Sequence, residues 1–380
     1  MIDTGNAVAL LATLVGIDTQ NPPGHEAEAA AFISAALAAI GMTVETDAYA
    51  PGRVNVVGRL VNGPGPVFAF NTHIDVVPVG AGWTSDPLTL RERDGRLYGR
   101  GACDAKGSLA AMIAACAALA ADRASWSGTL LAVFVADEEV ASDGAKRYAA
   151  NRPAIDYAVI GEPTGNSVVS AHKGSLRPLV SVRGLTAHSG TPQLGRNAVF
   201  HAARLLARFE TYAQTLARRT HPLCGHASLT VTRIEGGHAD NVIPEGCTFL
   251  LDRRMVPGES EADARAGIEA ILSEAAADGI EASIAEWRPT TGGATETAGD
   301  DPLVIAALAA SARHGGNGER TFGFMGGCDL VHFRTTGASG VVIGPGSLDV
   351  AHKPDEFVPI EELQAAVQLH AELARAMLKA

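Results

Sequence analysis

Uninterrupted apolar runs alternate with helical patterns in the first part of the chain and again near its end. Four short runs, at 66–70, 129–136, 157–160 and 340–343, contain almost no polar residue. A run without alternation is typical of a strand buried on both faces, as in a parallel sheet that helices cover. The pattern therefore predicts an α/β domain with a mixed, mostly parallel sheet flanked by helices.

Helical patterns fit between these runs. They are predicted at 26–40, 107–121 and 145–151, and a fourth helix is expected to begin at Pro302 with Asp301 as its N-cap. Asp is a favoured cap, and Pro is well tolerated at the first helical position.

The middle of the chain follows another order: strand, helix, strand, strand, helix, strand. These elements are predicted at 176–183, 197–219, 228–235, 247–255, 259–277 and 280–287. The order is that of the ferredoxin-like βαββαβ unit. Because a further apolar run follows it, we expect a small domain at 175–288 inserted into a larger one formed by 1–174 and 289–380.

Polar side chains follow each buried run. They are His73 and Asp75, Glu138 and Glu139, Glu162, and His352, with Asp104 at the start of a helix. Ligands bind at the carboxyl ends of the strands in open α/β sheets, and histidines with carboxylates make a metal site. Taken singly, each residue has a simpler role, such as a helix cap or a solvated loop.

Charge and cysteine content narrow the classes of function. The chain has 30 Lys+Arg against 42 Asp+Glu, a net charge of -12, which disfavours nucleic acid as a partner. No apolar stretch reaches the roughly 20 residues of a membrane span, and no basic segment precedes Arg53 as in a signal peptide. The five cysteines form no Cys-x-x-Cys. We therefore expect a cytoplasmic protein with no membrane partner.

Eight segments together resemble one enzyme family and occur in its order. They are NTHIDVVPVGAGWTSDPL, DGRLYGRGACDAKGSLAAMIAA, VADEEVASDGAK, VIGEPT, GLTAHSGTPQLGRNAV, ADNVIPE, LDRRMVPGE and GPGSLDVAHKPDEFV. The family is metallopeptidase family twenty, which comprises acetylornithine deacetylase, succinyl-diaminopimelate desuccinylase, aminoacylase and carboxypeptidase G. The resemblance implies a zinc-peptidase-like fold whose inserted domain is a lid and dimerisation domain.

Carried over by position, the resemblance implies two zinc ions, with cobalt or manganese as possible substitutes. His73, Asp104 and Glu162 would hold one ion, and Asp104, Glu139 and His352 would hold the other. Asp104 would bridge the two ions, and its peptide bond to the next residue would be cis.

The resemblance also implies roles for residues that bind no metal. Glu138 would be the general base, and Asp75 would hold the second ring nitrogen of His73. His188, in the inserted domain, would support the oxyanion in the site of a partner subunit. Adjacent glutamates can divide the work of base and ligand, because consecutive side chains point in different directions.

Substrate contacts are expected from both parts of the chain. Asn241 and Arg254 would face a substrate carboxylate, which an arginine can bind through two parallel hydrogen bonds. Gly346, within the Gly-Pro-Gly-Ser segment at 344–347, would line the pocket. Asp329 or His332 could contact substrate, although a structural role is the alternative for each.

The sequence thus predicts a homodimeric dinuclear zinc hydrolase that cleaves the amide bond of an N-acyl amino acid. Two alternatives stay open. One is a dipeptidase or carboxypeptidase of the same family, and the other is a member that only binds an amino-acid-like ligand.

Overall fold

The four buried runs are neighbouring strands of one nine-stranded sheet. They are β3 (Val67–His73), β6 (Gly128–Val135), β7 (Tyr157–Ile160) and β17 (Ser339–Val342). Their order is β6-β3-β7-β17, and each neighbouring pair is parallel. Every residue of β6 is buried, as expected of a strand with helices on both faces.

Antiparallel strands extend this parallel centre on both sides, so the sheet is mixed. β1 (Thr43–Ala50) pairs with β2 (Arg53–Asn62), and β2 pairs with β6, both antiparallel. On the other side, β8 (Val169–His172) pairs with β17 in the antiparallel direction. The sheet order continues to β15 (Thr295–Glu296), and β16 (Phe322–Phe324) pairs with β8.

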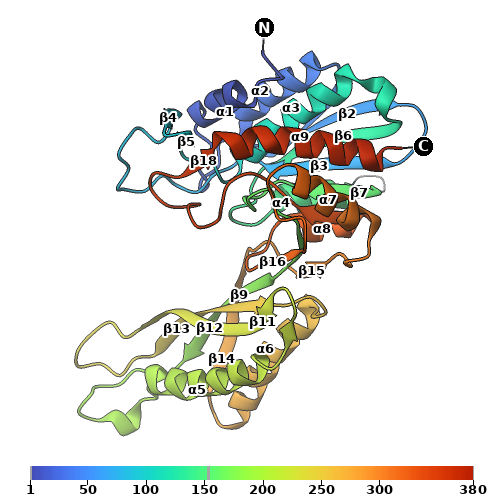
Figure 1. The fold of residues 1–380 in the computed structure, drawn as a ribbon. Coiled ribbons are helices and arrows are strands. Elements are labelled where there is room, and N and C mark those ends of the chain that lie inside the picture. The colour runs from blue at the N-terminus through green and yellow to red at the C-terminus, as the bar shows by residue number, and fades with distance from the viewer. Residues whose placement is uncertain (1, 152–154, 380) are drawn as a thin grey trace. The chain divides into compact units, whose positions relative to one another are not determined.

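Five helices enclose the main core on one face of this sheet. They are α1 (Ala7–Gly16), α2 (Ala27–Ala39), α3 (Lys106–Ala121), α7 (Pro302–Arg313) and α9 (Ile360–Met377). Their apolar side chains pack against alternate residues of the central strands, because neighbouring strand residues face opposite sides. Figure 1 shows α9 lying along the sheet beside α3.

Two shorter helices cover the other face. α4 (Asp143–Asn151) and α8 (Leu330–Arg334) pack together through the stacked rings of Tyr148 and Phe333, whose centroids lie 5.6 Å apart. α8 also lies against β17, where a Cβ on Gly340 would come within 2.3 Å of Leu330 Cδ1. A side chain at Gly340 would therefore force the Leu330 side chain to move.

Side-chain caps explain where several helices begin. Asp301 accepts a hydrogen bond from the backbone N–H of Leu303 at 2.8 Å and caps α7, as predicted. Asn6 caps α1 by accepting from the N–H of Ala9 at 3.1 Å.

The computed structural model describes residues 2–151 and 155–379, which form two compact units. The larger unit comprises Met1–Ala171, Glu296–Gly323 and Cys328–Ala380, as far as they are described. The second unit comprises His172–Thr295 and Phe324–Gly327.

The second unit has the ferredoxin-like order. Its elements are β9 (Gly174–Arg183), α5 (Ala198–Leu216), β12 (Ser228–Gly236), β13 (Gly246–Met255), α6 (Glu261–Ala277) and β14 (Glu281–Arg288). The sheet order is β12-β13-β9-β14, with every pair antiparallel. Phe209 of α5 packs edge-on against Phe249 of β13, with ring centroids 5.9 Å apart.

The remaining elements are short. β4 (Arg91–Arg93), β5 (Arg96–Tyr98) and β18 (Phe357–Pro359) form a three-stranded sheet, in which β5 is central. A two-stranded ribbon, β10 (Thr220–His221) with β11 (Gly225–His226), and two 3₁₀ turns, η1 (Arg123–Ser125) and η2 (Pro192–Leu194), complete the described elements. Within the described ranges, no helix has the length and hydropathy of a membrane span.

Candidate metal centre

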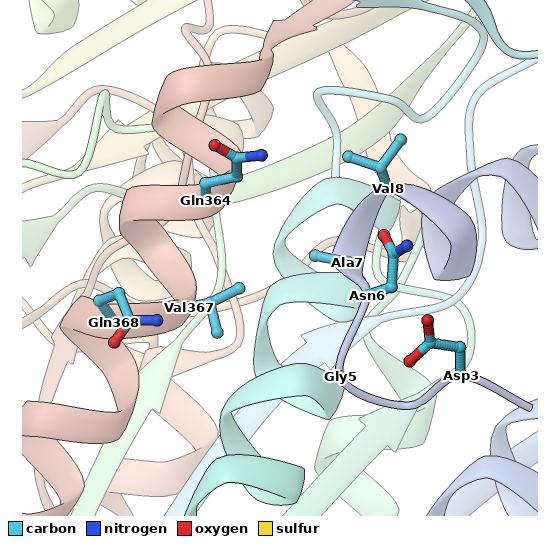
Figure 2. A pocket seen from close by; sticks show the side chains of 8 residues that line it. All are labelled: Asp3, Gly5, Asn6, Ala7, Val8, Gln364, Val367 and Gln368. Atoms are coloured by element: carbon cyan, nitrogen blue, oxygen red, sulfur yellow. The ribbon is translucent and has the colours of Figure 1, made fainter.

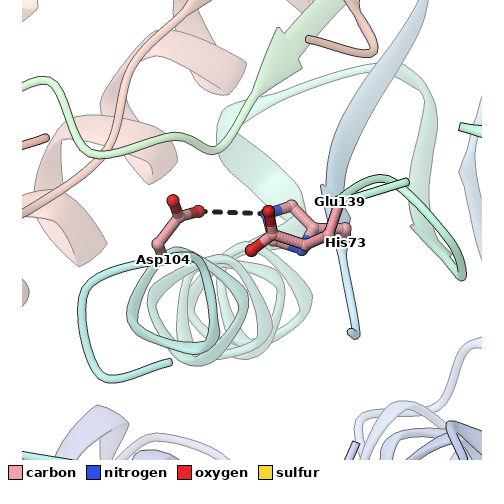
Figure 3. Close-up of side chains that lie close together, drawn as sticks. All are labelled: His73, Asp104 and Glu139. Atoms are coloured by element: carbon pink, nitrogen blue, oxygen red, sulfur yellow. Dashed lines mark hydrogen bonds and ion pairs between the residues drawn. The ribbon is translucent and has the colours of Figure 1, made fainter. Parts of the chain in front are cut away.

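The ligands predicted from the sequence lie at the carboxyl ends of the parallel strands. His73 is the last residue of β3, Glu139 follows β6, and Glu162 follows β7. Asp104 lies just before α3, and His352 lies in the segment that joins β17 to β18. Figure 3 shows that His73, Asp104 and Glu139 come together from these separate segments. Their possible ligand atoms all lie within 4.8 Å of one another.

His73 and Asp104 are in direct contact. His73 Nε2 lies 3.1 Å from Asp104 Oδ1, the contact drawn in Figure 3. Burial opposes a charge on His73, but the hydrogen bond to Asp104 and the nearby charge of Glu162 raise the pKa of this imidazole well above its usual value. The peptide bond that follows Asp104 is cis, as predicted.

The two oxygens of Asp104 divide the ligand candidates into two groups. Oδ1 faces His73, whose Nε2 is also 3.9 Å from Glu162 Oε2. Oδ2 lies 3.2 Å from His352 Nε2, and the same nitrogen lies 3.2 Å from Glu139 Oε2. Each group therefore contains one histidine and one glutamate, and the Asp104 carboxylate is common to both.

The chemistry of this cluster fits divalent cations. Glu139 Oε1 is buried, and no hydrogen-bond donor of the described residues reaches it. Burial raises the pKa of Glu139, Glu138 and Glu162, and neighbouring carboxylates raise these pKa values further. Bound cations would offset this repulsion. Imidazole nitrogens with carboxylate oxygens form the donor set that Zn²⁺ accepts, and Co²⁺ and Mn²⁺ use similar ligands.

His352 differs from the other candidates because its side chain is half exposed. Hydrogen bonds to Asp104 and Glu139 raise the pKa of this imidazole to about 10, against the effect of burial. The two histidines together lower the pKa of Asp104 below its usual range, although burial acts in the opposite direction. The two histidines thus favour the ionised form of Asp104, in contrast to the three glutamates of the cluster.

Asp75 contacts more than the histidine ring. The nearest contact of His73 Nδ1 is the main-chain carbonyl of Asp75 at 2.9 Å, whereas the carboxylate Oδ1 is 3.6 Å away. The carboxylate instead accepts hydrogen bonds from the backbone N–H groups of Glu138, at 3.1 Å, and Glu139, at 3.2 Å. Asp75 therefore fixes the chain at the end of β6 as well as the end of β3.

Glu356, which we did not select from the sequence, binds the main chain next to Asp104 in a similar way. Its Oε1 accepts hydrogen bonds from the backbone N–H groups of Cys103 and Asp104, both at 2.9 Å. Arg100 forms a buried ion pair with its other oxygen. The signal available was that Glu356 and His352 lie in one of the segments that carry the family resemblance, within HKPDEFV.

Two further predicted residues lie in the larger unit. Asp329 is buried, and burial raises the pKa of its carboxyl to about 7. Gly346 has φ +89°, and a Cβ there would lie 2.5 Å from Cys103 Sγ. Its N–H donates to Glu362 Oε2 at 2.8 Å. This position therefore requires glycine, because it combines a left-handed backbone with a close approach.

The remaining predicted residues, His188, Asn241 and Arg254, belong to the second unit. His188 and Asn241 are exposed, and the two loops are joined by a hydrogen bond from the N–H of Ser189 to the Asn241 carbonyl at 2.9 Å. Arg254 is partly buried and forms two contacts with Asp252, Nε to Oδ1 at 2.6 Å and Nη2 to Oδ2 at 3.2 Å.

A cavity of about 750 Å³ lies elsewhere in the larger unit, between the start of α1 and one side of α9 (Figure 2). Its lining residues are Asp3, Gly5, Asn6, Ala7, Val8, Gln364, Val367 and Gln368. None of them is a predicted site residue, so we keep the strand-end cluster as the candidate site.

Comparisons with known proteins identify one family model and several relatives. The family model described as Peptidase family M20/M25/M40 matches residues 69–376. Acetylornithine deacetylase of Myxococcus xanthus is 39% identical over 311 residues, which are 80% of this chain and 78% of that protein. Succinyl-diaminopimelate desuccinylase of Thioalkalivibrio sulfidiphilus is 31% identical over 327 residues, 83% of this chain and 84% of that protein.

Solved structures share the fold at lower identity. Aminopeptidase PepT from Bacillus cereus superposes on this chain with a TM-score of 0.81 at 22% identity. The match covers 100% of each of the two chains. The YXEP protein of Bacillus subtilis, described as a dinuclear metal binding peptidase, has a TM-score of 0.74 at 19% identity, covering 98% of this chain and 97% of that one.

Proposed function

The chain belongs to peptidase family M20/M25/M40 and is a metal-dependent hydrolase; from this premise we propose that it cleaves the amide bond of an N-acyl amino acid. One observation carries the proposal: the two oxygens of Asp104 face two groups of ligands, each with one histidine and one glutamate. The names of the relatives, acetylornithine deacetylase and succinyl-diaminopimelate desuccinylase, favour an acylated amino acid as the substrate class.

In this proposal His73, Asp104 and Glu162 would hold one zinc ion, and Asp104, Glu139 and His352 would hold the other. When bound, two such ions polarise a scissile carbonyl and lower the pKa of a bound water. Cobalt or manganese would bind the same donors.

Glu138 is the proposed general base. Asp75 fixes its main chain through the N–H contact at 3.1 Å. Burial, together with the charge of Glu162, raises the pKa of the Glu138 carboxyl, which strengthens it as a proton acceptor. Glu138 would accept the proton of the attacking water and pass it to the leaving amine. Its neighbour Glu139 stays a ligand.

The second unit would contribute recognition of the substrate and of the oxyanion. Arg254 and Asn241 would bind the substrate carboxylate, and Gly346 of the larger unit would line the pocket. A guanidinium can present two donors to one carboxylate, as Arg254 does here to Asp252 of its own chain. His188 would donate to the oxyanion in the site of a partner subunit.

A homodimer through the second unit is part of this proposal. β12 is the edge strand of the four-stranded sheet, and its residues are almost all exposed. Val231 and Ile234 on this strand are 38% and 50% exposed, and Phe200 at the start of α5 is 69% exposed. An unpaired edge beside exposed apolar side chains is a surface that another copy of the same strand can cover.

A substrate panel tests the proposal. Zinc-loaded protein is assayed with N-acetyl, N-succinyl and N-formyl amino acids and with dipeptides, before and after a chelator. We expect release of free amino acid from an N-acyl substrate and loss of this turnover with the chelator. Turnover of dipeptides alone would identify a dipeptidase or carboxypeptidase instead. Saturable binding of an amino-acid ligand without any turnover would identify a binding protein.

A further inference from the structure

Asp75 connects two of the segments that carry the proposed ligands. Its carbonyl lies 2.9 Å from His73 Nδ1, at the end of β3. Its carboxylate accepts from the N–H groups of Glu138 and Glu139, at 3.1 and 3.2 Å, just beyond β6. The position of Asp75 therefore affects the imidazole of one ligand and the main chain of a second ligand and of the base. The side chains that hold Asp75 in place lie further from the proposed ligands.

Asn21 bridges Asp75 to a second buried carboxylate. Its Nδ2 donates to Asp75 Oδ2 at 2.8 Å and to Asp137 Oδ1 at 3.0 Å. Each of the two N–H bonds of this amide is thus directed at a different carboxylate. Asn21 is 2% exposed, and without these donors two buried carboxylates would each lose a hydrogen bond.

Arg53 fixes the orientation of the Asn21 amide. Its Nη2 donates to Asn21 Oδ1 at 2.7 Å, so a reversed amide would turn its NH₂ group toward the guanidinium and its oxygen toward two carboxylates. The same Nη2 lies 2.9 Å from Asp137 Oδ1, and Nη1 pairs with Glu26. The guanidinium is the cation that balances this group of buried acids, and its planar fork reaches all three partners.

The loop after Asn21 is shaped around this guanidinium. Gly24 has φ +90°, and a Cβ there would lie 2.2 Å from Arg53 Cζ. The backbone N–H of Asn21 also donates to the Val76 carbonyl at 2.8 Å, which keeps the loop beside the segment that carries Asp75. Arg53 is therefore enclosed by the chain, and its side chain is only 14% exposed.

We propose that Asn21 and Arg53 are positioning residues of the metal centre, which act through Asp75 to hold His73 and the segment of Glu138 and Glu139 in place. Neither residue would touch substrate or metal. Their contribution is to set the position and orientation of Asp75. The inference rests on the proposed function, because it takes His73 and Glu139 as metal ligands.

Zinc binding to the metal-free protein tests this inference. The variants are Asn21→Leu, which keeps the volume without the amide, Arg53→Met, and the milder Arg53→Lys. Arg147→Met is the matched control, because Arg147 pairs with Asp47 at 2.5 and 3.1 Å but is 48% exposed. Zinc affinity is measured in competition with a chelator, and the visible spectrum of the cobalt-loaded protein reports ligand geometry.

We expect Asn21→Leu and Arg53→Met to weaken zinc binding about 10- to 100-fold and to alter the cobalt spectrum, as is typical for residues behind metal ligands. Arg53→Lys keeps the charge but not the fork and should be intermediate. Arg147→Met should stay within about twofold of wild type. If Arg53→Met does not fold, Asn21→Leu and Arg53→Lys still decide the question.

His73→Ala separates the two levels of the proposal. If it weakens zinc while Asn21→Leu and Arg53→Lys retain wild-type affinity and spectrum, the positioning inference is wrong and the proposed ligands stand. A lower melting temperature of these variants without a change in zinc affinity would show a purely structural role and would also overturn it. If His73→Ala itself retains wild-type affinity, the proposed ligand set fails, and the positioning inference fails with it.

Discussion

The predicted site residues of the two units are held in different ways. In the larger unit His73 and Asp104 are buried and in contact, and each is fixed from behind by a further buried residue, Asp75 or Glu356. In the second unit His188 and Asn241 are exposed, and their hydrogen bonds go to their own and neighbouring loops. A metal site needs all its ligands fixed at once, whereas a residue that acts on substrate or on another subunit needs only to be accessible.

The largest effect we expect comes from Glu138→Gln in the buried cluster. This change removes the proposed base but no proposed ligand, so metal content should stay at the wild-type level. Turnover should fall by about 10³-fold, within the usual contribution of a general base. Metal analysis of the purified variant, with kcat on the best substrate of the panel, provides the measurement.

Glu139→Gln is the matched control for this first prediction, because the two glutamates are adjacent and both main chains bind Asp75. It should weaken the binding of one metal ion. Equal loss of metal in both variants would contradict the division of roles between base and ligand.

The next prediction concerns His188, one of the exposed site residues of the second unit. We expect His188→Ala to lose about 10²- to 10³-fold in kcat, the usual effect of removing an oxyanion donor. If His188 acts in the partner's site, His188→Ala and Glu138→Ala refolded together should regain activity in mixed dimers. Each mixed dimer has one complete site, and half of the dimers are mixed, so about a quarter of wild-type activity should return.

Labelled chains would establish that mixed dimers have formed. Activity that remains at the level of the separate variants in such a sample would mean that His188 works within its own chain or has no catalytic role. Refolded wild-type protein, carried through the same procedure, gives the reference activity.

Much of the fold follows from local patterns, because buried strands and capped helices leave short-range signals. The run at 157–160 became β7 with the same bounds, and Asp301 caps α7 as predicted. The antiparallel strands β1 and β2 were not assigned. β2 pairs with β6 through residues far along the chain, such as Asn62 with Gly128, and no local period reveals that contact. β1 and β2 pair locally, with Ala50 opposite Arg53, so this hairpin was missed although its two strands are adjacent in sequence.

The same limit applies to the candidate site, where contacts between residues distant in sequence were not predicted. Ligand candidates could be selected because strand ends share one edge of a parallel sheet. Asp75 was selected beside His73, but Asn21 and Glu356 were missed, because their partners are distant in sequence. Asn21 contacts Asp137 across 116 positions, and Glu356 contacts Cys103 across 253. A single sequence does not indicate which asparagine or glutamate will meet a strand end from so far away.

A smaller effect is expected at Arg254 in the second unit. Arg254→Lys should raise KM for a substrate with a free carboxylate about tenfold and leave kcat nearly unchanged, since a lysine loses the two-pronged contact. Arg177→Lys is the matched control, because Arg177 Nε binds the same Asp252 at 3.0 Å. An equal rise of KM in both variants would show that Arg254 acts by holding Asp252 and does not bind the substrate carboxylate.

The smallest effect we expect is on the pH dependence of stability, and it concerns a buried residue of the larger unit. Burial, with a contribution from Asp75, raises the pKa of Glu26 from 4.5 to about 7. The folded state therefore keeps a proton that the unfolded state releases between these values, and the free energy of unfolding falls as pH rises from about 4.5 to 7. Glu26→Gln should remove this decline, which we expect to be on the order of 2 kcal/mol.

Urea unfolding of the metal-free protein from pH 5 to 8 measures this decline. The control is Glu28→Gln, an exposed glutamate two residues further along the chain. A pH slope in Glu26→Gln equal to that of wild type would show that Glu26 releases its proton at the usual pH, so that the guanidinium of Arg53 outweighs burial at this position.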